Sequence, residues 1–193
     1  MVEILSAFGL SAATGLNAYL PLLIVGLLGR FTGWITLKSP WNLLENTWIL
    51  VLLAVLFAIE TVVDKIPAVD TVNDVIQTLI RPAAGAVLFA SGSNVISEIS
   101  PVAAMVCGLL VAGSVHAAKA SARPMITAST GGLGNPVVST AEDVVSGVSA
   151  FVSVVLPILA AVFIAILVGL FIWWRIRWNR RNAARDPAHA ASS

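Results

Sequence analysis

The side chains most able to do chemistry in this sequence are the charged ones of residues 60–74. Glu60 and Asp64 end an apolar run at an i, i+4 spacing, which puts both carboxylates on one face of a helix. Two carboxylates held close in a low dielectric either raise the proton affinity of one of them or share a cation. Lys65 follows directly as a counter-charge. The stretch therefore predicts a site that binds a proton, an ion or a small charged solute.

A basic stripe further along the chain is expected to face these carboxylates. His116, Lys119 and Arg123 share a helix face at i, i+3, i+7 if their helix continues that far, and Glu142 follows in the next apolar segment. A lone histidine within a membrane more often hydrogen-bonds a neighbouring helix than relays protons. The two stripes are either interhelical staples that fix the packing or the walls of a substrate or coupling-ion site.

The composition identifies the elements that position these charges as membrane helices. Of the 193 residues, 58% are hydrophobic and 11% are charged, whereas soluble domains have about 45 to 50% and about 25%. A bilayer core needs about 20 apolar residues as a helix. Four segments meet or approach that length, and residues 81–99 either cross as a thin helix or re-enter. The predicted fold class is all-α, a polytopic membrane protein with about five transmembrane helices.

The first of these segments, residues 4–28, is expected to be broken near its middle. Thr14-Gly15-Leu16-Asn17 and then Pro21 weaken the ladder of backbone hydrogen bonds. An unwound backbone there could offer carbonyl groups to an ion, with Asn17 lining the path. Alternatively, the small residues simply allow close packing of neighbouring helices.

Three further features complete the predicted arrangement. Residues 70–80 have a polar stripe opposite an apolar one and are expected to lie along the membrane interface as an amphipathic helix. Residues 120–136, rich in Gly, Ser, Thr and Pro, form either a plain connection or an anion-binding loop. Residues 139–142 match a capping box and predict the start of the last helix. Cys107 lies in an apolar run and is expected to be buried and inert.

Arginine and tryptophan determine the predicted orientation. Five arginines fall in the last 20 residues, and the positive-inside rule places them in the cytoplasm. With five crossings the N-terminus is outside, and all six tryptophans lie on the cytoplasmic side. Residues 1–174 form the membrane domain and residues 175–193 a basic, disordered tail. Contacts with anionic lipid headgroups, rather than nucleic acid, are assigned to Arg175, Arg177, Arg180 and Arg181.

Several short motifs recur together in a known family. They are Gly15-Leu-Asn-Ala-Tyr-Leu-Pro21, Asp64-Lys-Ile-Pro67, Arg81-Pro-Ala-Ala-Gly85, His116-Ala-Ala-Lys119 and Glu142-Asp143. In these motifs the chain resembles an uncharacterised family of small bacterial membrane proteins, domain of unknown function 4126. The resemblance covers about residues 5–157 and implies a bacterial inner-membrane location. It implies no activity. A weaker similarity, of residues 60–64 to the acidic motif of cation/proton exchangers, lacks that motif's glycine.

The expected function is a membrane protein of transporter type that binds or moves a small solute or ion, with a cation/proton exchanger as a lesser alternative. The competing hypothesis is a scaffold or assembly factor that transports nothing. No Ser-His-Asp order, metal signature or nucleotide fingerprint stands out in the sequence, so we expect no enzyme activity, cofactor or metal site. The identity of the solute and the oligomeric state stay open, and a homo-oligomer is compatible with the sequence.

Overall fold

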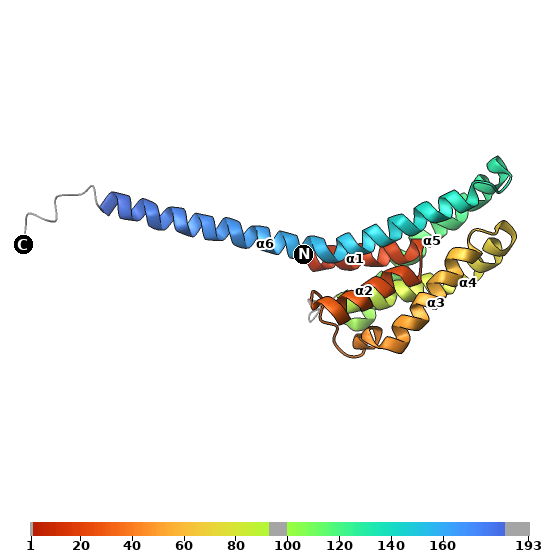
Figure 1. The fold of residues 1–193 in the computed structure, drawn as a ribbon, viewed down its shortest axis with the longest axis horizontal. Coiled ribbons are helices and arrows are strands. Elements are labelled where there is room, and N and C mark those ends of the chain that lie inside the picture. The colour runs from red at the N-terminus through yellow and green to blue at the C-terminus, as the bar shows by residue number, and fades with distance from the viewer. Residues whose placement is uncertain (1, 93–99, 184–193) are drawn as a thin grey trace, which may run out of the picture. The chain divides into compact units, whose positions relative to one another are not determined.

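In a computed structural model, which describes residues 2–92 and 100–183, the chain is helical, as the composition predicted (Figure 1). Three stretches, residues 72–92, 101–130 and 135–159, are long and apolar enough to cross a membrane, and three shorter helices are also apolar. The protein is therefore of the helical membrane type. Its elements are α1 (Val2–Leu16), α2 (Tyr19–Thr32), η1 (Trp41–Glu45), α3 (Thr47–Val63), α4 (Pro67–Gly92), α5 (Pro101–Thr130) and α6 (Asn135–Ala183).

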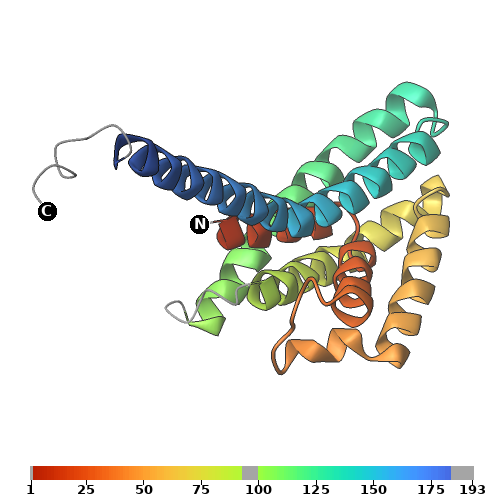
Figure 2. The same ribbon diagram turned by 60° about the vertical axis from the view of Figure 1, so that its left-hand side comes forward.

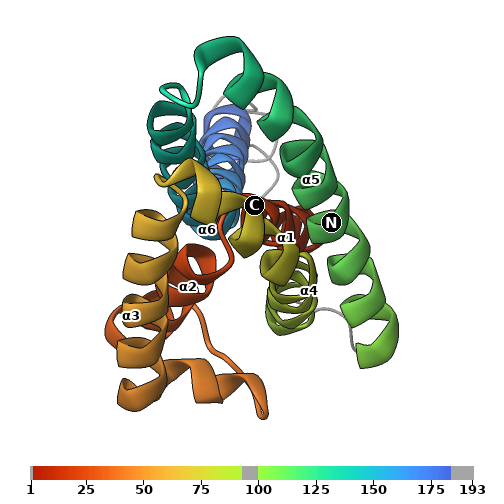
Figure 3. The same cartoon turned by 90° about the vertical axis from the view of Figure 1, so that its right-hand side faces the viewer.

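The chain divides into two compact units, Met1–Val155 and Leu156–Ser193. In the first unit, α1, α4 and α5 pack against one another, and α2 packs on α3 and η1 (Figure 3). In the second unit, the described residues all belong to α6, which continues to Ala183. Residues 175–183 are thus helical rather than part of a disordered tail, because no glycine or proline interrupts them. The rest of the predicted tail lies outside the described residues.

The predicted break in the first apolar segment is confirmed. α1 ends at Leu16 and α2 begins at Tyr19. The Asn17 side chain caps α2, since its Oδ1 accepts hydrogen bonds from the backbone N–H of Tyr19 (3.1 Å) and Leu20 (2.9 Å). Helices α1 and α5 also pack closely at this place. A Cβ added to Gly15 would lie only 2.6 Å from the carbonyl oxygen of Ala112.

Helix α4 corrects the predicted boundary at residue 81. The expected interfacial helix and the start of the third segment form one continuous helix with Pro82 inside it. Proline is tolerated within membrane helices where neighbouring groups satisfy the backbone. The polar face of α4 is buried at Gln77 and Arg81, while Val72, Val75 and Leu79 are exposed. The polar side of this stretch therefore packs on protein, rather than lying along the membrane interface as predicted. Residues 93–99 lie outside the described part.

The boundaries of α5 and α6 also differ from those predicted. Ser100 caps α5, accepting a hydrogen bond from the backbone N–H of Ala103 at 3.2 Å. However, α5 continues to Thr130, so much of the predicted loop at 120–136 is helical. The helix ends where Gly131 and Gly132 adopt φ of 61° and 86°, a backbone conformation that favours glycine. Helix α6 then begins at Asn135, one turn before the predicted capping box.

Cys107 is exposed rather than buried. It lies on the part of α5 where Met105, Val106, Leu109 and Leu110 are also exposed. In a membrane protein an apolar outer face is expected to contact lipid, so an apolar run does not by itself indicate a buried position.

The contact between α4 and α5 gives a test of the packing. A Cβ on Gly108 would lie 2.3 Å from the Gly85 carbonyl oxygen and 2.6 Å from Phe89 Cβ. We expect Gly108→Ala to destabilise the protein by about 1 to 3 kcal/mol, because overpacking forces the helices apart. Thermal unfolding in detergent measures this. Gly113→Ala is the matched control, since its new Cβ would lie 3.6 Å from the Pro82 ring. Equal losses in the two variants would contradict the packing described.

Candidate functional site

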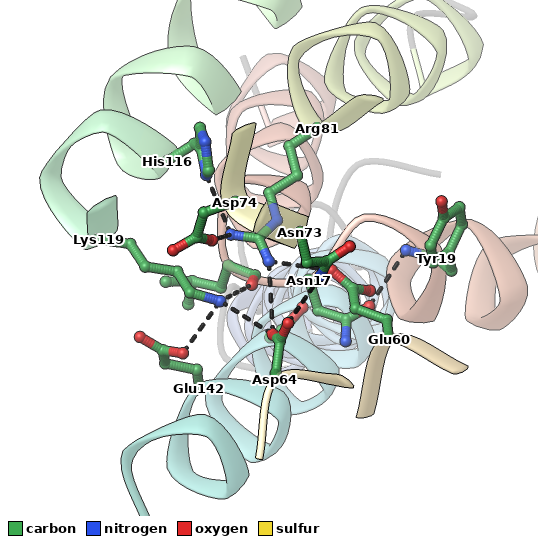
Figure 4. Close-up of polar contacts among 12 residues, drawn as sticks. Asn17, Tyr19, Glu60, Asp64, Asn73, Asp74, Arg81, His116, Lys119 and Glu142 are labelled. Atoms are coloured by element: carbon green, nitrogen blue, oxygen red, sulfur yellow. Dashed lines mark hydrogen bonds and ion pairs between the residues drawn. The ribbon is translucent and has the colours of Figure 1, made fainter. Parts of the chain in front are cut away.

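A group of charged side chains lies at one end of the first unit. The turn after α3 and the turn between α5 and α6 lie at this end (Figure 2). Side chains from α4 join those from α5, α6 and the end of α3 in a continuous chain of ion pairs, here called the ion network (Figure 4). Its members are Glu60, Asp64, Asp74, Arg81, Lys119, Arg123 and Glu142.

Arg81 is the central cation of one half of the network. Its side chain is fully buried, with Nη2 3.0 Å from Glu60 Oε1 and 3.6 Å from Asp64 Oδ2. Its Nη1 lies 3.7 Å from Asp74 Oδ1. A planar guanidinium suits this role because it offers several N–H donors in a fixed geometry. The second oxygen of Glu60, Oε2, is buried and has no hydrogen-bond partner among the described residues.

His116 orients Arg81 through a hydrogen bond whose direction follows from chemistry. Its Nδ1 lies 3.0 Å from Arg81 Nη1, and its Nε2 lies 3.1 Å from Thr78 Oγ1. A guanidinium has donors only, so Nδ1 must accept and Nε2 carries the hydrogen that it donates to Thr78. Thr78 in turn donates to the Asp74 carbonyl oxygen at 2.8 Å. His116 is thus a positioning residue, since both of its nitrogens are engaged within the protein.

Lys119 and Arg123 hold the other half of the network. Lys119 Nζ lies 3.0 Å from Glu142 Oε2, 3.4 Å from Asp64 Oδ2 and 3.1 Å from the Leu16 carbonyl oxygen. Arg123 Nη2 donates to Glu142 Oε2 at 2.6 Å. The carbonyl group of Leu16, at the break in the first segment, therefore accepts a hydrogen bond from the Lys119 side chain. This lysine takes the place of the bound ion that was considered for the break.

Two asparagines donate hydrogen bonds to carboxylates at this end of the unit. Asn17 Nδ2 donates to Asp143 Oδ1 at 2.9 Å, while its own oxygen caps α2. Asn73 Nδ2 donates to Asp64 Oδ1 at 2.8 Å. Asn17 thus links the broken first segment to α6, and Asn73 on α4 bonds a carboxylate of the network.

In the structure, the acidic stripe faces the basic stripe, as the sequence predicted. Glu60 and Asp64 are buried, and so are all three residues of the basic stripe on α5. Lys65 is exposed just beyond α3 and lies at the surface. Of the arginines assigned to lipid headgroups, Arg175 and Arg177 are exposed on α6, and Arg180 and Arg181 are helical positions of α6.

Two network residues, Arg81 and Asp74, were missed by sequence reasoning. Asp74 lies in the helix predicted along the membrane interface, residues 70–80, and Arg81 directly follows that helix. One signal pointed to Arg81: it precedes Pro82 just as Arg123 precedes Pro124, and both arginines pair with carboxylates of other helices.

An open cavity of about 570 Å³ lies between α4 and α5 beside the network. Asp74 and Arg123 belong to both the cavity wall and the network, so the cavity exposes charges of both signs. Among the described residues, no group of three or more His, Cys, Asp or Glu side chains is placed to hold a metal ion. The cavity is lined by Asp74, Val75, Thr78, Ala120, Arg123, Pro124, Thr127 and Ala128.

The fold and the buried charges define a helical protein of the membrane type with a polar site at one end of its first unit. The chain matches the family model Domain of unknown function (DUF4126) over residues 4–177. It therefore belongs to this family, as the motif resemblance indicated. No curated protein and no solved structure matches the chain.

The double role of Asn17 gives a second prediction. Asn17→Ala removes the cap of α2 and leaves Asp143 without this donor, so we expect a loss of about 2 to 4 kcal/mol. Thermal unfolding measures it. Asn46→Ala is the control, because Asn46 caps α3 through the Trp48 N–H at 2.9 Å and is exposed. That variant should lose only about 1 kcal/mol. Equal losses would show that the bond to Asp143 contributes nothing.

Proposed function

We propose that the protein is a transporter-type membrane protein whose ion network binds and releases a proton at Glu60. The observation that carries the proposal is the buried Glu60 carboxyl group, of which Oε1 pairs with Arg81 while Oε2 has no hydrogen-bond partner among the described residues. A buried acceptor without a donor is costly. A proton on this group would remove its charge.

The charge balance of the network supports a bound proton. In the described residues, the chain of ion pairs joins four acidic side chains to three basic ones. Asp143 follows Glu142 directly in α6 and adds a further carboxylate, which accepts a hydrogen bond from Asn17. Excess negative charge within a membrane protein is expensive and usually marks an ion or proton site. A proton needs only one carboxylate, whereas a multivalent metal needs several that converge.

Protonation would alter the position of Arg81. With Glu60 neutral, Arg81 loses its closest ionic partner, and the attraction of Asp64 and Asp74 gains relative weight. Asp74 lines the cavity. A proton on Glu60 would therefore change, through Arg81 and Asp74, the electrostatic environment of a solute bound in the cavity. This is the coupling that an ion-driven transporter requires.

The scaffold hypothesis is supported by a different observation. Arg81, Lys119 and Arg123 each pair with a carboxylate from another part of the chain, and these contacts join α3, α4, α5 and α6. Such pairs would fix the helix arrangement even if nothing were transported. They also leave Glu60 Oε2 and the open cavity without a role.

Flux through purified protein separates the two hypotheses. Proteoliposomes that contain a pH-sensitive dye would be challenged with a panel of small cations and metabolites. The proposal expects at least one solute to drive proton movement that protein-free liposomes do not show. If no solute of the panel drives proton movement, although the protein is folded and inserted, the scaffold hypothesis is favoured.

For the orientation we propose a bacterial inner-membrane protein with five crossings, the C-terminus in the cytoplasm and the ion network near the outer side. The exposed Trp173 and Arg177 on α6, with the guanidinium 5.1 Å from the indole ring, suit a headgroup region. In a Cys107→Ala background, single cysteines at Asp70 and Ser129 should both react with an impermeant reagent from outside. Reaction of only one would contradict five crossings.

A further inference from the structure

The cavity between α4 and α5 has the size and position of a binding site for a solute. Its volume of about 570 Å³ falls within the roughly 300 to 1,000 Å³ of small-molecule sites. The two helices touch where Gly108 meets Gly85. The cavity opens further along, toward the end of the unit that holds the ion network.

The length of α5 brings this cavity toward water. Its 30 residues span about 45 Å, whereas a hydrocarbon core of about 30 Å takes about 20 residues. The N-terminal half of α5 is apolar on its outer face, and its charged residues follow from position 116 onward. The C-terminal turns, which carry Arg123 and Thr127, are therefore the ones that extend beyond the hydrocarbon.

Charges of opposite sign line the cavity from its two helices. Asp74, on α4, has the longest of the three contacts to Arg81, and its Oδ1 makes no hydrogen bond to the described residues. Asp74 also lines the cavity, where a carboxylate can accept hydrogen bonds from an ammonium group. Arg123, on α5, is anchored by Glu142, and a guanidinium fork suits a carboxylate or phosphate.

The remainder of the wall suits a short aliphatic spacer between two such groups. The hydroxyl groups of Thr78 and Thr127 are the other polar side chains of the lining, and the rest is apolar. The apolar lining residues are Val75, Ala120, Pro124 and Ala128.

We infer that this cavity binds a small zwitterion, with its ammonium group at Asp74 and its acidic group at Arg123. A free amino acid and an ethanolamine lipid headgroup share this chemistry. The inference rests on the proposed function in one respect, that the bound zwitterion is the solute moved with the proton. Binding itself can be measured without flux.

Thermal unfolding of the purified full-length protein in detergent tests the inference. The probes are glycine, β-alanine and γ-aminobutyrate, with butyrate and butylamine as analogues that carry one charge. At least one zwitterion should raise the unfolding midpoint in a concentration-dependent way, and neither analogue should do so at equal concentration. Added short-chain phosphatidylethanolamine, compared with phosphatidylglycerol, gives the lipid arm. Stabilisation by either zwitterionic source supports the site and identifies the source, and stabilisation by neither overturns it.

Variants then locate the binding. Asp74→Asn should weaken the response about tenfold or more, and Ala120→Leu should abolish it by filling the cavity. Ala117→Leu places the same side chain at an exposed position on the same helix and should leave the response unchanged. If Asp74→Asn does not fold, Ala120→Leu still decides. An unchanged response in the Ala120→Leu variant overturns the inference.

The two proposals fail separately. Proton movement that depends on Glu60 without any zwitterion response removes only this inference. A zwitterion response without proton movement removes only the proton site.

Discussion

Arg81→Met should destabilise the folded protein by about 3 to 5 kcal/mol, the largest loss we expect from any single change in the network. The reason is that Arg81 is fully buried and lies within 3.0 to 3.7 Å of three carboxylates, one on α3, one at the C-terminal end of α3 and one on α4. Removing it leaves those charges facing one another in a low dielectric. Thermal unfolding and the yield of folded protein in detergent measure the effect.

A matched control and a rescue sharpen this test. Arg30→Met removes an exposed arginine from α2 and should change stability by less than about 1 kcal/mol. Adding Glu60→Gln to Arg81→Met should restore part of the loss, because one unpaired charge is removed. A fully stable Arg81→Met protein would contradict the central position of Arg81.

Glu60→Gln should abolish proton movement while the protein stays folded and inserted. Glutamine has the shape of a protonated glutamate and can still accept from Arg81, which also keeps its contacts with Asp64 and Asp74. We therefore expect a loss of stability of only about 1 to 3 kcal/mol. The measurement is dye-reported proton flux in proteoliposomes, with unfolding midpoints measured on the same preparations.

Glu45→Gln is the control for the flux experiment. Glu45 lies at the end of η1, outside the ion network, so its replacement should leave flux unchanged. If Glu60→Gln fails to fold, Glu60→Asp keeps a carboxyl group at a shifted position and should retain reduced flux. Normal flux in a folded Glu60→Gln protein would exclude Glu60 as the proton-binding group.

The helical class, the break at Asn17 and the facing charge stripes could all be predicted from the sequence. The reasons are local: apolar runs long enough for membranes, residues that weaken the helix ladder, and carboxylates at i, i+4. Successive membrane helices run in alternating directions, and this places Glu60 and Asp64 on the same side of the membrane as Lys119 and Arg123.

The role of Arg81 could not be predicted in the same way. Periodicity shows that α4 has a polar face and an apolar face, but it does not say which one meets protein. In water the polar face would be outside, whereas in lipid it must be inside. The decisive partners of Arg81 are Glu60 on α3 and His116 on α5, which are far apart in sequence. The extension of α5 past Pro124 was missed because proline and small residues there resemble a loop.

Infrared difference spectroscopy of the purified protein between high and low pH observes the proton on the carboxyl group itself and so tests whether Glu60 binds it. If Glu60 binds the proton, a carboxylic acid C=O band appears at low pH in the wild-type protein and in Glu45→Gln but is missing in Glu60→Gln. An unchanged set of bands in Glu60→Gln would contradict this expectation and would leave the ion network as an interhelical staple.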